Sequence, residues 1–179
     1  MTTAPASAPA IVPVFDDDAG AQRTLAIICS KGSLDMAYPG LVLANAALGE
    51  GVETHLFFTF WGFDIITTSR MHDLTISPVG NTAMHLPGQD AHFPQALAPL
   101  PGMTAMATRM MKKSIAKLDI PEVPEFLDQI VAAGGHLWAC RMSADMNGLG
   151  AGDLRDDVEG IISASDFIEK TAGAQLLFI

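Results

Sequence analysis

Short apolar runs alternate with helix signals along most of this chain. Two of these runs, Thr24–Cys29 and His136–Cys140, have the length of central strands in a parallel sheet, and residues that can begin a helix follow each of them. Strands that alternate with helices favour βαβ units, in which helices cover both faces of the sheet. The sequence therefore predicts an α/β fold, a three-layer α/β/α sandwich with a mostly parallel five- or six-stranded sheet.

The other elements follow from apolar spacing and from the positions of glycine and proline. We expect further strands over 52–59, 159–164 and 175–179, and helices over 34–48, 64–70, 103–118, 125–133, 143–147 and 165–172. Pro39 falls inside the first of these helices, which predicts a late helix start or a kink. The proline-rich stretch 71–101 predicts a long loop with a short strand near 74–79, and loops of this length are often functional.

The 179 residues are enough for one domain and a tail. Residues 1–21 are rich in alanine, proline and threonine and end in an acidic stretch, which predicts a flexible N-terminal tail. Residues 22–179 then form a single domain. Because 49% of the chain is hydrophobic, this domain can build its core without disulfides or a structural metal.

Charge and cysteine content limit the partners and the compartment. The chain has 10 Lys and Arg against 20 Asp and Glu, a net charge of -10. Nucleic acids and anionic membranes require a basic surface, so this balance argues against both. We expect no transmembrane helix and no signal peptide. Two cysteines are too few for a disulfide scaffold, which favours a reduced, cytoplasmic setting.

Cys140 is the first candidate for chemistry, because it ends an expected strand and precedes an expected helix. In open α/β sheets, ligands bind just beyond the carboxyl ends of the strands. A helix start and a nearby cation, here Arg141, lower the pKa of a thiol. Cys140 and Ser143 form a C-x-x-S pattern without a local resolving thiol, which favours a persulfide over a local disulfide. The alternative is a buried cysteine that acts as a small hydrophobe.

Cys29 has the same position relative to its own strand and is the second candidate. Lys31 and the following helix could activate its thiol, whereas burial at a strand end is the alternative. The loop 30–33 could bind an anion at the helix start, although it lacks the P-loop pattern for nucleotides. A Cys29–Cys140 disulfide is a further possibility that requires Cα atoms within about 7 Å.

The five histidines do not form a metal-binding pattern along the chain. No two of them lie four residues apart, and the cysteines and histidines lack zinc-finger spacing. His55 and His136 lie in expected strands, which favours a role in the core. His85 and His92 lie in the long loop, where a surface position is favoured over a site. We therefore predict no metal and no bound cofactor.

Several segments together resemble the DsrE/DsrF/DrsH-like family, in particular its peroxiredoxin-like, sulfur-carrier branch. They are LAIICSKGSLD at 25–35, FFTFWG at 57–62, the methionine-rich helix that begins near Met103, and WACRMS at 138–143. The resemblance extends over residues 22–179. It implies a three-layer α/β fold, homo-oligomers (trimers, tetramers or hexamers) and carriage of sulfane sulfur as a cysteine persulfide. The chain lacks the peroxidatic P-x-x-x-T-x-x-C pattern, so peroxidase activity is not implied.

The resemblance also implies roles for individual residues. The sulfur-carrying cysteine of the family matches Cys140, and a second cysteine of this branch matches Cys29. The implied partners are a TusA-like sulfurtransferase or a heterodisulfide-reductase-like complex. We thus expect a sulfurtransferase-like carrier whose persulfide is shielded by the long loop and the methionine-rich helix. A non-catalytic oligomeric scaffold subunit and a thiol redox protein remain as alternatives.

Overall fold

A computed structural model describes residues 23–85 and 91–179 of the chain. The predicted tail over residues 1–21 lies outside the described residues, so its flexibility stays a prediction. Among the residues that the structure describes, no helix has both the length and the apolar character needed to cross a membrane.

Five parallel strands form the sheet in the order β4-β3-β2-β1-β5, and every neighbouring pair runs parallel. The strands are β1 (Thr24–Cys29), β2 (Glu53–Phe58), β3 (His136–Cys140), β4 (Val158–Ile162) and β5 (Gln175–Phe178). The central strands β1, β2 and β3 are almost entirely buried, and most of their residues are apolar, as in a parallel sheet that helices cover on both faces. The predicted α/β fold with a parallel sheet is confirmed.

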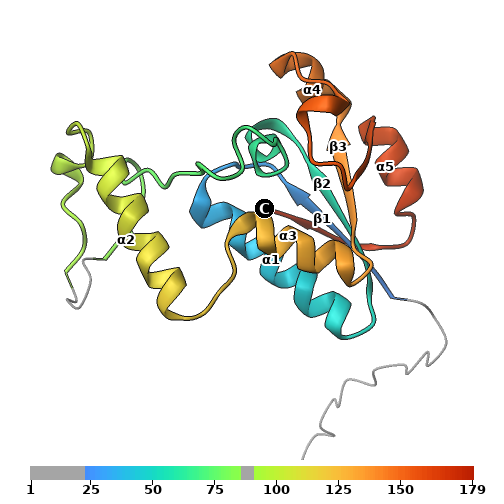
Figure 1. Cartoon of the computed structure of the whole chain (residues 1–179), viewed down its shortest axis with the longest axis horizontal. Helices are drawn as coiled ribbons and strands as arrows, with labels where there is room; N and C mark the ends of the chain where they lie inside the picture. Colours follow the sequence, from blue (N-terminus) through green and yellow to red (C-terminus); the bar gives the residue numbers. More distant parts are fainter. Residues whose placement is uncertain (1–22, 86–90) are drawn as a thin grey trace, which may run out of the picture.

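Helices cover both faces of this sheet, as Figure 1 shows. The helices are α1 (Leu34–Gly49), α2 (Met103–Lys117), α3 (Val123–Ala132), α4 (Arg141–Asn147) and α5 (Ala164–Lys170). The main core lies between the sheet and the helices α1 and α3, whereas α5 packs on the opposite face through Phe167. Helix α2 stands to one side of the layers, at the left of Figure 1.

Three local predictions are wrong. Helix α1 begins at Leu34 in spite of Pro39, so the late helix start is wrong, because one proline removes a single backbone donor and fifteen other residues maintain the helix. No strand forms over 74–79, although Leu74 and Ile76 are buried in an irregular segment. The helix expected over 64–70 is instead a 3-10 helix, Phe60–Ile65, that begins two residues after β2.

Candidate functional site

Both cysteines lie at the carboxyl edge of the sheet, but they point into different layers. Cys29 ends β1 and packs in the core beneath α1, whereas Cys140 ends β3 and packs with the cluster beneath α5. Strand β2 lies between them, so their Cα atoms are about 9–10 Å apart, twice the usual spacing of strands. This separation and the opposite orientations argue against a disulfide between them within one chain. Both thiols are free.

Cys140 forms part of the wall of an open pocket of about 620 Å³. The pocket lies beyond the ends of β1, β2 and β3, where parallel sheets bind ligands. It is lined mainly by apolar side chains, with Arg141 and Asp145 as its charged members. The full lining is Ile28, Phe57, Thr59, Phe60, Cys140, Arg141, Met142, Asp145, Ser163, Ala164 and Phe178. A thiol at this position is buried at its base and faces a space that is open to solvent.

The surroundings of Cys140 favour its thiolate. Burial opposes ionisation of this thiol and by itself would raise its pKa. Hydrogen bonds from the Thr59 and Ser143 hydroxyls and from the backbone N–H groups of Met142 and Ser143 have the opposite effect. Together these hydrogen bonds outweigh burial, so the pKa of Cys140 is lowered. Cys140 is the residue immediately before α4, so these two N–H groups belong to the first turn of that helix. Donors that stabilise the anion lower a thiol pKa and make the sulfur a better nucleophile near neutral pH.

The two hydroxyls are held in a fixed arrangement. Ser143 is fully buried, and its Oγ lies 3.2 Å from Oγ1 of Thr59. The backbone N–H of Phe60 donates to the same Oγ over 2.6 Å, and Phe60 has a φ of 48°. A phenylalanine in this left-handed region is strained, and such strain is common at functional sites. The packed start of the 3-10 helix therefore maintains Ser143 beside the thiol.

Thr59 is a site residue that the sequence analysis did not single out. It directly follows β2, just as Arg141 follows β3, and these two strands are neighbours. Adjacent parallel strands bring the residues after their carboxyl ends together, so the position of Thr59 after a strand was an available signal.

Arg141 has a different role from the predicted one. Its guanidinium donates to the backbone carbonyl of Ile161 on the neighbouring strand β4, over 2.6 Å. Neutral donors, and not this cation, account for the lowered pKa of Cys140. Arg141 lines the pocket and remains able to contact a ligand or a partner there.

Cys29 has the opposite environment. Its Sγ points at helix α1, where a Cβ added to Gly40 would lie 3.1 Å away. Burial raises the pKa of this thiol to about 12, so Lys31 does not activate it. These observations favour the structural interpretation of Cys29 over the catalytic one.

The loop 30–33 does not provide an open anion site either. A Cβ on Gly32 would lie 2.1 Å from the carbonyl oxygen of Trp61, so the 3-10 helix closes one side of the loop. The N–H of Leu34, at the start of α1, donates to the carbonyl of Thr75. Ser33 occupies the N-cap position of α1, but its side chain makes no capping hydrogen bond. The N–H of Ser30 likewise donates to the carbonyl of Ile179, so two of the N–H groups in this region already have partners within the chain.

The long loop and α2 do not shield Cys140, contrary to expectation. Neither contributes a described residue to the lining of the Cys140 pocket. His85 and His92 contact each other through a bridge within the loop, with ring centroids 4.5 Å apart. The segment from His72 to Leu74 and helix α2 instead line a second, small cavity against α1 and the start of α3.

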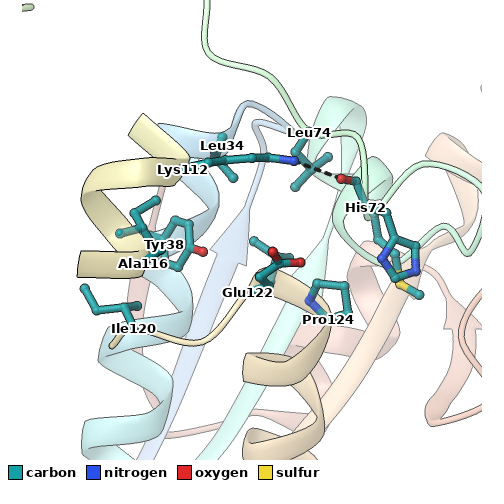
Figure 2. A pocket seen from close by; sticks show the side chains of 12 residues that line it. Leu34, Tyr38, His72, Leu74, Lys112, Ala116, Ile120, Glu122 and Pro124 are labelled. Carbon is teal, nitrogen blue, oxygen red and sulfur yellow. Dashed lines mark hydrogen bonds between the residues drawn. The ribbon is translucent and has the colours of Figure 1, made fainter. Parts of the chain in front are cut away.

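Figure 2 shows this second cavity, which has a volume of about 50 Å³. Lys112 reaches across it and donates to the backbone carbonyl of His72 over 3.1 Å. Tyr38 also lines it, and burial together with the charge of Glu122 raises the pKa of its hydroxyl. The space is enough for a few water molecules, and neither cysteine faces it. The cavity is therefore not the site of thiol chemistry.

An apolar surface continues from the Cys140 pocket along the thinly covered face of the sheet. Phe178 on β5 is 71% exposed, and Leu176 on the same strand is half exposed. Phe60, Met142 and Met146 add exposed apolar side chains beside the pocket. Contiguous apolar patches of this kind usually mark interaction surfaces.

Known proteins resemble this chain over nearly all of the described domain. The model of the DsrE/DsrF/DrsH-like family matches residues 21–179. A protein of Allochromatium vinosum named "Sulfur carrier protein DsrE2" is 36% identical over 147 residues, which cover 82% of this chain and 91% of the relative. "Uncharacterized protein YrkE" of Bacillus subtilis is 24% identical over 163 residues, 86% of this chain and 94% of the relative.

A solved structure shares the fold at much lower sequence identity. It is a protein of unknown function, MTH1491, from Methanobacterium thermoautotrophicum. The superposition has a TM-score of 0.53 with 9% identity and covers 88% of this chain and 99% of the other. At this identity the likeness concerns the fold alone.

Proposed function

Because this chain belongs to the DsrE/DsrF/DrsH-like family, we propose that it is a sulfur carrier that holds sulfane sulfur as a persulfide on Cys140. The match to a protein named as a sulfur carrier supports a role in sulfur relay. The observation that carries the proposal is the position of Cys140, a thiol of lowered pKa in the wall of an open pocket. Cys29 has neither property.

The proposed transfer needs no redox partner. The Cys140 thiolate attacks the outer sulfur of a donor persulfide, so that a new S–S bond forms while the donor S–S bond breaks and the donor leaves as a thiolate. An acceptor thiolate then attacks the outer sulfur of the Cys140 persulfide, and Cys140 leaves as a thiolate. The proton on the transferred sulfur is exchanged with solvent. Each step consumes one persulfide and one thiolate and forms one of each, so no electrons are gained or lost overall.

The donors around Cys140 suit both steps. In the second step Cys140 is the leaving group, and a thiol of lowered pKa leaves faster. The hydroxyls of Thr59 and Ser143 would stabilise the departing thiolate as they stabilise the resting one. The largely apolar wall of the pocket would limit attack by water on the bound sulfur.

The apolar surface beside the pocket supports contacts with other proteins. We propose that the chain forms homo-oligomers and that a TusA-like sulfurtransferase or a heterodisulfide-reductase-like complex exchanges sulfur with Cys140. Exposed phenylalanine and methionine side chains at the rim of the pocket suit such docking. A monomeric mass in sedimentation velocity runs at micromolar concentration would contradict the oligomer.

Intact-mass spectrometry tests the carrier directly. The wild-type protein, Cys140→Ser and Cys29→Ser are incubated with polysulfide and analysed with and without reductant. We expect wild type and Cys29→Ser to gain about 32 Da per bound sulfur, reversed by reductant, and Cys140→Ser to gain none.

Cys29→Ser is the matched control, because it changes the same atom in the same kind of position at the end of a strand. Loading of Cys140→Ser at the wild-type level would contradict the assignment. If no variant gains sulfur although circular dichroism shows folded protein, the non-catalytic scaffold replaces the carrier as the interpretation.

A further inference from the structure

Four polar side chains meet at the amino edge of the sheet, at the opposite end of the strands from Cys140. His55 of β2 pairs in register with His136 of β3, and their rings stack with centroids 4.5 Å apart. Glu53 lies two residues before His55 and therefore on the same face of the sheet. One nitrogen of each histidine and a carboxylate oxygen of Glu53 all lie within 4.8 Å of one another. Glu159 of β4 is the fourth member.

The arrangement places each donor in a defined orientation. The side chain of His55 is only 6% exposed, whereas those of Glu53 and His136 are each 35% exposed. The Nδ1 nitrogen of His136 hydrogen-bonds to the carboxylate of Glu159, which leaves its Nε2 nitrogen directed away from that pair. A carboxylate on the far nitrogen of a histidine is the usual outer partner of a metal ligand, because it sets the tautomer and raises the basicity of the ring.

We propose that Glu53, His55 and His136 bind a divalent transition-metal ion of the zinc class. Two imidazoles and one carboxylate form a common zinc donor set, which leaves a fourth position for water or an exogenous ligand. Imidazole also suits Cu²⁺ and Ni²⁺, whereas Mg²⁺ and Ca²⁺ prefer oxygen donors throughout.

The geometry requires only a local adjustment. Zinc bonds of about 2.0–2.1 Å place tetrahedral donor atoms about 3.3 Å apart, so the cluster must contract. Glu53 and His136 are the partly exposed members and are able to move, whereas buried His55 provides the fixed point. Two carboxylates, Glu53 and Glu159, also make the local charge favourable for a cation.

Metal binding would change the proton on His55. The indole N–H of Trp138 donates to Nδ1 of His55 over 3.2 Å, so the proton of the neutral ring is on Nε2, which donates to Glu53. A metal ion at Nε2 displaces this proton, either to Nδ1 or to solvent. If the proton moves to Nδ1, the indole N–H of Trp138 loses its acceptor, and the indole must change position. Trp138 is thus a natural reporter of the site.

The site is separate from the proposed sulfur site. His136 and Cys140 are the first and last residues of β3, so about 13 Å of strand lies between them. Neither of the two ligands from β2 contributes to the lining of the Cys140 pocket. The metal proposal therefore does not depend on the proposed function, and its test uses a chain in which the thiol is absent.

Calorimetric titration with Zn²⁺ tests the proposal on metal-free Cys140→Ser protein, in which the reactive thiol cannot compete. We expect one zinc ion per chain and a change in the fluorescence of Trp138, measured in a Trp61→Phe background. His136→Asn and Glu53→Gln are expected to weaken binding at least tenfold, and Glu159→Gln about tenfold.

His85→Asn is the matched control, because His85 and His92 form a second histidine pair with the same 4.5 Å separation of ring centroids. It is expected to leave the zinc affinity unchanged. Equal affinity in His136→Asn and the parent protein, or no binding at millimolar Zn²⁺, would overturn the proposal. Circular dichroism without metal confirms that each variant folds. If His136→Asn does not fold, the isosteric Glu53→Gln decides the result.

Discussion

Cys29 and Cys140 end two parallel strands of one sheet, yet their environments differ in almost every respect. Cys29 faces a layer of two long helices and packs against the backbone of one of them at Gly40. Cys140 faces the layer with the single short helix α5, where a pocket remains open beside it. The pKa of the first thiol is raised and that of the second is lowered.

The comparison shows that the face of the sheet, and not the end of the strand, decides the chemistry of a thiol here. Side chains alternate between the two faces along a strand. In β1 the last residue points toward the thick helical layer, and in β3 it points toward the thin one. A thick layer desolvates the thiol and supplies no donors, whereas the thin layer leaves room for hydroxyls, N–H groups and a ligand.

The largest expected difference is in alkylation. At pH 7 iodoacetamide should modify Cys140 at least about 100-fold faster than Cys29 in the folded protein, because the fraction of thiolate falls tenfold for each unit of pKa and Cys29 is also inaccessible. Peptide mass spectrometry over a time course measures both rates. In guanidinium chloride the two rates should become similar. Equal rates in the folded protein would remove the distinction between the two sites.

A double-mutant cycle sharpens the structural side of the comparison. Alanine is more stable than glycine inside a helix by about 1 kcal/mol, but a Cβ at position 40 would lie 3.1 Å from Sγ of Cys29. Gly40→Ala should therefore add about 1 kcal/mol to the free energy of unfolding in a Cys29→Ala background and little or nothing in wild type. Urea denaturation of the four proteins measures the coupling.

Gly49→Ala is the control for this cycle. Gly49 ends the same helix, and an added Cβ there would meet nothing within 4 Å. Its effect on the free energy of unfolding should be equal in both backgrounds. If Gly40→Ala also had equal effects, the close packing of Cys29 against α1 would be disproved.

The smallest effect is expected at Ser143, where one of several donors is removed. Ser143→Ala takes away a hydroxyl that favours the thiolate, so the pKa of Cys140 should rise. The pH profile of alkylation should then move to higher pH, and the rate at pH 7 should fall about threefold. The variant also leaves the N–H of Phe60 without its acceptor and should lose about 1–3 kcal/mol of stability.

Asn147→Ala separates these two consequences. Asn147 donates to the backbone carbonyl of Ser143 over 2.8 Å and belongs to the same helix. Loss of this hydrogen bond should destabilise α4 but leave the pH profile of Cys140 alkylation unchanged. A profile that moved equally in both variants would mean that the stability of the helix, and not the Ser143 hydroxyl, controls the thiol.

Much of the fold could be predicted because its determinants are local. The run of apolar residues His136–Cys140 is a strand with the predicted bounds, and α2 differs from its prediction by one residue. The predictions failed where tertiary contacts replace local preference. The segment 74–79 has the apolar residues of a strand, but its buried backbone is satisfied from outside any sheet, for example by the Thr108 hydroxyl that accepts from Ile76.

The sequence by itself determined that strands alternate with helices, and hence that the two cysteines lie at one edge of a parallel sheet. Only the tertiary structure decided which thiol faces a pocket, because a side chain's face depends on strand order and on which helices cover each layer. The same holds for His55 and His136, which are far apart in the chain and stack only because β2 and β3 pair in register. Local patterns specify elements, but a site depends on pairing between strands that are distant in the sequence.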